Sequence, residues 1–151
     1  MENTFEINLA SRNVLLKFLD NYSLEQLNKI PEGFSNNLIW NIAHIIVVQQ
    51  MLVYNLSGLP MMVPGEMVAK YKRGTRPEQD LTQTEVDAIK ALLFSTLEKT
   101  KQDFASGIFK SYTEFTTMTG FTVKTAEAAI EFNNYHEATH VGMMMQIRKF
   151  V

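Results

Sequence analysis

The three histidines are the side chains best suited to chemistry in this chain of 151 residues, which contains no cysteine. His136 and His140 stand four positions apart, so on a helix their rings share one face at about 6 Å. Two imidazoles at that spacing can bind the same metal ion. His44 is the only other histidine, so it is the only imidazole left to act as a third ligand. The pattern predicts a site for one divalent metal ion on His44, His136 and His140.

A histidine pair on an apolar helix face can also be structural. The same face carries mostly apolar residues at spacings of three and four, namely Ala129, Asn133, Met143, Met144 and Ile147. A buried imidazole must satisfy both ring nitrogens, and hydrogen bonds to a backbone carbonyl or to Asn133 would do so without a metal. From the residues alone, the metal site and the hydrogen-bonded core histidines both stay open.

Glu137 is the candidate catalytic residue, because His136-Glu137-x-x-His140 has the form in which zinc proteases use the glutamate as a general base. A protease is disfavoured here, since only 11 residues follow His140 and leave no room for a downstream third ligand. On a helix Glu137 is rotated by about 100° from His136. Three roles therefore remain for Glu137: a partner of a metal ligand, a general base, or an exposed charge.

A divalent transition metal on three neutral imidazoles keeps its full charge and an open coordination position, as in catalytic zinc sites. Imidazole suits zinc, nickel and iron alike, so the sequence does not select the metal. Such an ion lowers the pKa of bound water to about 7 and deprotonates a bound thiol. Because the chain has no cysteine, a thiol must come from solution. We expect a small-molecule substrate and a transferase that uses a low-molecular-weight thiol, or a hydrolase that uses water. The alternative is a non-catalytic bundle with a structural or vestigial metal site.

Helical periodicity and capping residues predict four long helices, over residues 4–19, 36–56, 82–104 and 125–149. Thr4 is the expected N-cap of the first helix and Thr125 that of the last. A short turn is expected at 23–27, and a long connection at 58–80 contains one further helical turn near 66–71. The β-branched and aromatic residues of 106–124 predict a short extended excursion or hairpin. The fold class is therefore all-α, a four-helix bundle.

The segment 33–65 contains no Asp, Glu, Lys or Arg, and its polar residues make it a poor membrane span. We expect it to be a buried helix rather than a membrane helix. Its apolar surface is more than one helix can hide against two neighbours, which predicts a homodimer.

Composition indicates one folded domain spanning 1–151, with 46% hydrophobic and 20% charged residues. The net charge of -2 and the lack of a long basic run make nucleic acid an improbable partner. The N-terminus lacks the basic and apolar regions of a secretory signal, so the expected location is the cytoplasm.

Several of these features together resemble the DinB/YfiT-like superfamily. Trp40 precedes His44 by four positions, and His136 and His140 are followed by Gly142, as in that family. The connection at 74–77 is similar to the family's Gly-Ser-x-Pro stretch, and the resemblance covers essentially the whole chain.

The resemblance implies an up-down-down-up four-helix bundle, often a homodimer, with the three histidines on one divalent ion. It also implies an activity among thiol-dependent transferases or isomerases that act on small molecules. One departure is Met143-Met144-Met145, where family members often have a polar Gln, and it leaves the ligands unchanged.

Overall fold

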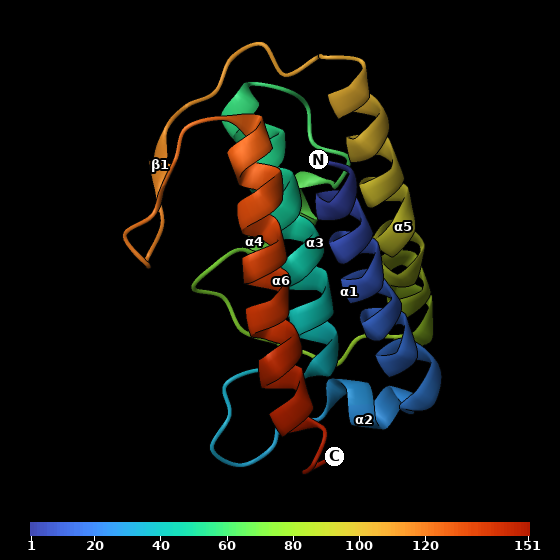
Figure 1. Cartoon of the computed structure of the whole chain (residues 1–151). Coiled ribbons are helices and arrows are strands. Elements are labelled where there is room, and N and C mark those ends of the chain that lie inside the picture. The colour runs from blue at the N-terminus through green and yellow to red at the C-terminus, as the bar shows by residue number, and fades with distance from the viewer.

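The chain folds as an all-α structure, seen here in a computed structural model that describes all residues 1–151 (Figure 1). Four long helices account for most of it: α1 (Glu2–Asn21), α3 (Leu38–Val53), α5 (Gln83–Ala105) and α6 (Ala126–Ile147). The long helices of the sequence analysis are all present, and their ends lie close to the predicted positions.

Side-chain caps explain where three of the long helices begin. Asn37 accepts a hydrogen bond from the backbone N–H of Trp40 at 2.8 Å and starts α3. Thr82 starts α5 through a reciprocal capping box with Glu85, and Thr125 caps α6. The prediction that Thr4 caps the first helix was wrong. Helix α1 begins after Met1 with no side-chain cap, so Thr4 lies inside its first turn.

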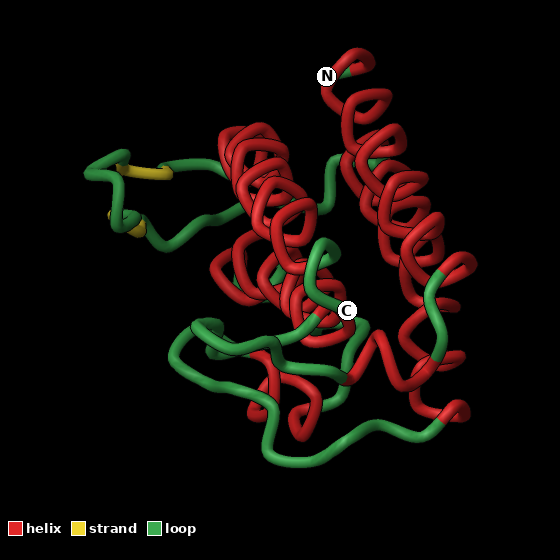
Figure 2. Tube along the Cα trace, turned by 90° about the horizontal axis from the view of Figure 1, so that it is seen from below, coloured by secondary structure: helices red, strands yellow, loops and turns green.

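The shorter elements lie in the connections. Helix α2 (Leu24–Asn28) follows a capping box at Ser23, and a 3-10 turn, η1 (Asn55–Ser57), continues α3 until Gly58 ends it at φ 70°. Helix α4 (Gly65–Tyr71) is the helical turn expected in the long connection. Strands β1 (Phe115–Thr116) and β2 (Thr122–Val123) pair antiparallel, and this hairpin projects from the helices (Figure 2).

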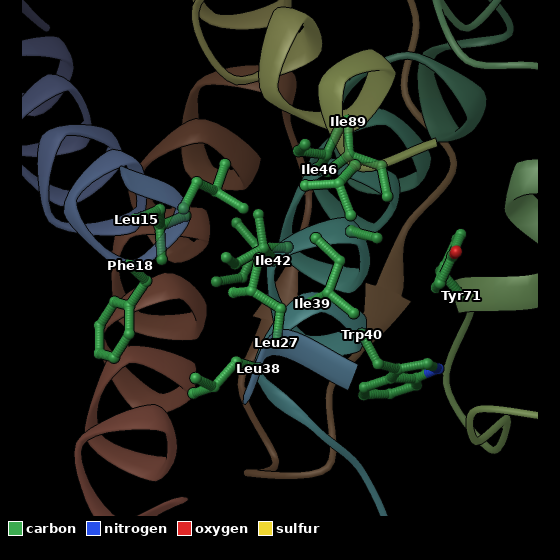
Figure 3. Packing of buried hydrophobic residues seen from close by; sticks show 14 of the residues in the cluster. Leu15, Phe18, Leu27, Leu38, Ile39, Trp40, Ile42, Ile46, Tyr71 and Ile89 are labelled. Atoms are coloured by element: carbon green, nitrogen blue, oxygen red, sulfur yellow. The ribbon is translucent and has the colours of Figure 1, made fainter. Parts of the chain in front are cut away.

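Helix α3 is the central element of the core. It packs against α5 and α6, α1 packs against the same two helices, and α2 and α4 cover α3 further. Isoleucines of α3 such as Ile42 and Ile46 meet Leu15 of α1 and Ile89 of α5 (Figure 3). A second, smaller cluster around Leu97 and Val123 fills the end of the molecule near the hairpin.

Helix α3, the helical part of the charge-free segment, is buried within the single chain. Of the 16 residues of α3, 14 are buried. By length and composition alone, the stretch Leu38–Ser57 could cross a membrane. However, 83% of its apolar 18-residue window is buried inside the protein. This agrees with a core helix. Helices α2, α4, α5 and α6 of the same chain cover α3, so its burial does not require a second copy. The homodimer itself stays a prediction.

Candidate metal centre

The three histidines come together from two adjacent helices. His44 lies in the middle of α3, and His136 and His140 lie one turn apart on α6. The centroid of the His44 ring lies 5.2 Å from that of His136 and 4.6 Å from that of His140. The His136 and His140 rings are 4.6 Å apart. One nitrogen of each ring lies within 4.8 Å of the other two, so the three could hold one metal ion.

His44 is held by its neighbours in one orientation and one tautomer. Its Nδ1 lies 2.6 Å from the carbonyl oxygen of Tyr71 at the end of α4. A carbonyl only accepts, so Nδ1 carries the proton and Nε2 keeps its lone pair. Trp40, one turn earlier on α3, stacks on the ring at 4.6 Å with an interplanar angle of 14°. The lone pair of Nε2 is therefore available to a metal.

Asn41 fixes His140 in the same way. The Asn41 amide nitrogen donates to the carbonyl oxygen of Asn37 at 2.7 Å and to the side-chain oxygen of Asn36 at 3.0 Å. The amide oxygen must then be the atom that faces Nδ1 of His140, at 2.8 Å. His140 donates through Nδ1, which leaves Nε2 as a lone-pair ligand.

His136 has no such partner. Its Nδ1 is buried and makes no hydrogen bond. The hydrogen-bonded core interpretation offered Asn133 as the partner, but the Asn133 amide donates to Glu137 instead, at 2.8 Å. A buried ring left this way is costly in a purely structural cluster. The hydrogen-bonded core interpretation therefore fails at His136, which favours the metal site.

Burial keeps the three rings neutral, the form in which imidazole binds metals. It lowers the pKa of His136 to about 3 and that of His140 to about 4, and the neighbouring histidines, together with Arg12 for His136, shift both pKa values in the same direction. Burial also lowers the pKa of His44, although the hydrogen bond to Tyr71 works in the opposite direction. A metal would therefore displace no proton from the histidines near neutral pH.

The spacing of the rings fits a tetrahedral ion after a small movement. At a metal–nitrogen distance of about 2.1 Å, tetrahedral ligands stand about 3.4 Å apart. Nitrogens at the outer limit of 4.8 Å would each move inward by about 0.8 Å, within the range of small side-chain rotations. Three neutral imidazoles this close together are thus a suitable donor set for a divalent transition metal.

The histidines lie in the wall of a cavity of about 540 Å³. This volume suits a small molecule. The wall is formed by α3, α6, the turn after α4 and the β1–β2 hairpin, and its apolar side chains include Trp40, Val48, Met51, Leu52, Leu56, Phe115, Met118 and Phe132. A metal ion on the three rings would face this space.

A family comparison agrees with this architecture. The sequence matches the family model described as DinB superfamily over residues 9–144. The chain belongs to the DinB superfamily. None of the curated proteins compared with the sequence matches it. The match includes His44, His136 and His140, so all three candidate ligands lie in the shared region of this DinB domain.

Glu137 lies next to the site but in a network of its own. Its carboxylate is fully buried, so the exposed-charge role is wrong. The Oε1 atom accepts from the Arg12 guanidinium at 2.8 and 3.1 Å, and from the amides of Asn8 and Asn133 at 3.0 and 2.8 Å. Both partners of the ion pair are 0% exposed. Glu137 does not line the cavity, and its predicted catalytic role stays a prediction.

The sequence analysis of this DinB chain missed Arg12 and Asn8. A signal for both existed, because Phe5, Asn8, Arg12, Leu15 and Leu19 recur at spacings of three and four along the first helix. A charged residue in the middle of an apolar stripe must find a buried partner of opposite charge. The sequence analysis also missed the Tyr71 carbonyl, because a backbone carbonyl is present at every residue and no side chain marks this one.

The predicted face of α6 was correct except at one position. Ala129, Asn133, Met144 and Ile147 are buried, as expected, whereas Met143 is 38% exposed. Met143 precedes Met144 by one position and is therefore rotated by about 100° from it, away from the core.

Proposed function

We propose that this DinB domain is a metal-dependent enzyme, a thiol-dependent transferase or a hydrolase, that acts on a small molecule. One observation carries the proposal: three neutral imidazoles, two of them with the Nε2 lone pair left free by a hydrogen bond at Nδ1, converge at the wall of a cavity of about 540 Å³. A purely structural metal site is usually closed by four protein ligands, whereas a catalytic one keeps a position for water or substrate.

The histidines would bind zinc, nickel or iron, since each of these ions accepts imidazole. When bound, such an ion would supply Lewis acidity that makes a water or a small thiol nucleophilic near neutral pH. The protein's own part is to hold the ligands: the Tyr71 carbonyl orients His44, and the Asn41 side chain orients His140.

The position of the Arg12–Glu137 pair supports a role for it in orienting the metal-binding face of α6. It joins α1 to α6 one residue from His136, and its atoms are buried away from the cavity. A fixed register of α6 would keep His136 and His140 turned toward α3. A direct acid–base role for Glu137 requires its second oxygen, Oε2, which is buried without a hydrogen-bond partner.

We further propose that the four long helices form the up-down-down-up bundle of the family. The chain directions support this: in Figure 1, α1 and α6 run one way, and α3 and α5 run the other way. The cytoplasmic location and the homodimer are also proposals, and size measurement in solution tests the latter against the chain mass of 17.3 kDa.

A non-catalytic bundle with a structural or vestigial site remains the competing function. One observation favours it, because no Asp or Glu side chain lines the cavity to serve as a general base. Thiol binding separates the two functions, since an enzyme of the proposed type must leave the ion accessible.

The decisive experiment uses the cobalt-substituted protein. Addition of a low-molecular-weight thiol should produce a sulfur-to-metal charge-transfer band, and the band should be absent in the His136→Ala variant. A spectrum that changes with acetate but not with thiols would replace the transferase by a hydrolase. A spectrum that no small ligand changes would mean a closed site and would refute the enzyme proposal.

A further inference from the structure

Arg73 is the only charged side chain among the residues that line the histidine cavity. It takes part in none of the three ion pairs of the molecule, and no Asp or Glu lines the same space. The cavity therefore combines an apolar wall with one cation that has no counter-charge in the protein.

The backbone that carries Arg73 is held in place next to the histidines. Two residues earlier, the Tyr71 carbonyl accepts the His44 hydrogen bond at 2.6 Å. Consecutive Cα atoms are about 3.8 Å apart, so the Arg73 Cα lies within about 8 Å of the Tyr71 Cα. The segment then turns at Gly74, whose φ is 88°, and the Thr75 N–H donates to the Lys72 carbonyl at 3.3 Å. This turn presents Arg73 at the rim of the cavity.

The rest of the wall is largely apolar and comes from α3, the hairpin and α6. Phe115 and Met118 of the hairpin face the cavity, as do Phe132 of α6 and Met51 of α3. Met118 is 77% exposed and Phe115 is 42% exposed, so both keep apolar surface that a ligand can cover. Covering such surface favours a ligand with a hydrocarbon or aromatic body.

We propose that the substrate of this site is an amphiphilic anion: an apolar body that packs against α3, the hairpin and α6, and an anionic group that pairs with Arg73. The guanidinium provides a fork of N–H donors that matches a carboxylate, sulfonate or phosphate. The inference rests on the proposed function, because it assigns the substrate class of the same cavity. It makes Arg73 a specificity-determining residue.

Octane-1-sulfonate is a suitable probe, because sulfonates bind metal ions weakly. Its proposed contact with Arg73 also requires no bound metal. Methyl octyl sulfone is the neutral probe of similar shape. Trp40, the single tryptophan, lines the cavity and reports binding through its fluorescence. We expect the chelator-treated protein to bind the sulfonate more tightly than the sulfone, with an affinity that falls as salt is added.

The Arg73→Gln variant should bind octane-1-sulfonate at least about fivefold more weakly and should bind the sulfone unchanged. Lys72→Gln is the matched control, since Lys72 is the adjacent exposed cation and does not line the cavity. Circular dichroism checks that both variants fold.

Equal binding of sulfonate and sulfone by the natural protein would overturn the proposal, as would equal losses in the two variants. A third probe, 3-mercaptopropane-1-sulfonate, tests whether the anion belongs to a thiol cosubstrate. If Arg73→Gln weakens this thiol alone, the proposed substrate class is wrong. Failure of the enzyme proposal would appear separately, in the cobalt spectrum, because the sulfonate measurement needs no metal.

Discussion

The buried Arg12–Glu137 pair should contribute strongly to the folding of the domain. Both side chains are 0% exposed, and the Nη2–Oε1 distance is 2.8 Å. Replacing Arg12 by Met would leave the Glu137 carboxylate buried with only the amides of Asn8 and Asn133 as partners. Breaking a buried pair from one side costs about 3–5 kcal/mol. We therefore expect Arg12→Met to lower the free energy of unfolding by that amount.

Urea denaturation followed by circular dichroism measures this loss, and thermal denaturation should show a decrease in Tm of about 6–20 °C. The double variant Arg12→Met, Glu137→Met removes both charges, so it should lose less stability than either single variant. The exposed pair of Lys90 and Asp20, whose side chains are 43% and 47% exposed, is the control within the chain. Lys90→Met should change stability by less than about 1 kcal/mol.

Two results would refute this reasoning. Losses below about 1 kcal/mol in both single variants would mean that the Arg12–Glu137 pair behaves as an exposed one. Strictly additive losses in the double variant would mean that the two side chains do not interact across the α1–α6 contact.

Two further predictions concern the histidines. Asn41→Ala removes the acceptor that orients His140, so chelator competition should show metal affinity about 10- to 100-fold weaker; unchanged affinity would refute the orienting role. In metal-free protein, the folded pKa values of His136 (about 3) and His140 (about 4) lie below the unfolded value of 6.5, so the unfolded chain binds more protons. Stability contributed by the neutral rings should be present above pH 6.5 and lost as the pH falls toward 4. The urea concentration at the unfolding midpoint should therefore fall as the pH is lowered over that range, and it should fall less in the His136→Phe variant. Equal pH dependence in the natural protein and this variant would contradict the low pKa of His136.

Local sequence signals predicted most helix starts, because the deciding interactions are themselves local. Asn37, Thr82 and Thr125 each accept a hydrogen bond from an N–H three residues later, which can be read from the residue type and its position. The start at Met1 carries no such signal, since no side chain caps it.

The candidate site was predictable only as far as side chains with strong chemical preferences define it. His44, His136 and His140 were identifiable because imidazole is the usual nitrogen ligand of transition metals in proteins and the chain has only these three histidines. Arg73 and the Tyr71 carbonyl were not, because any exposed arginine or any backbone carbonyl looks the same in sequence. Their roles depend on the path of the connection between α4 and α5.

The most direct test of the account is the metal content of the protein purified without a metal-affinity tag. Elemental analysis should find one divalent transition metal ion per chain in the natural protein. His44→Ala, His136→Ala and His140→Ala should each hold much less than one, while circular dichroism stays close to that of the natural protein. Thr139→Ala is the control, because Thr139 lines the same cavity between the two α6 histidines and is not a ligand. It should keep the full ion, whereas full metal content in His44→Ala would contradict the three-histidine site that joins α3 to α6.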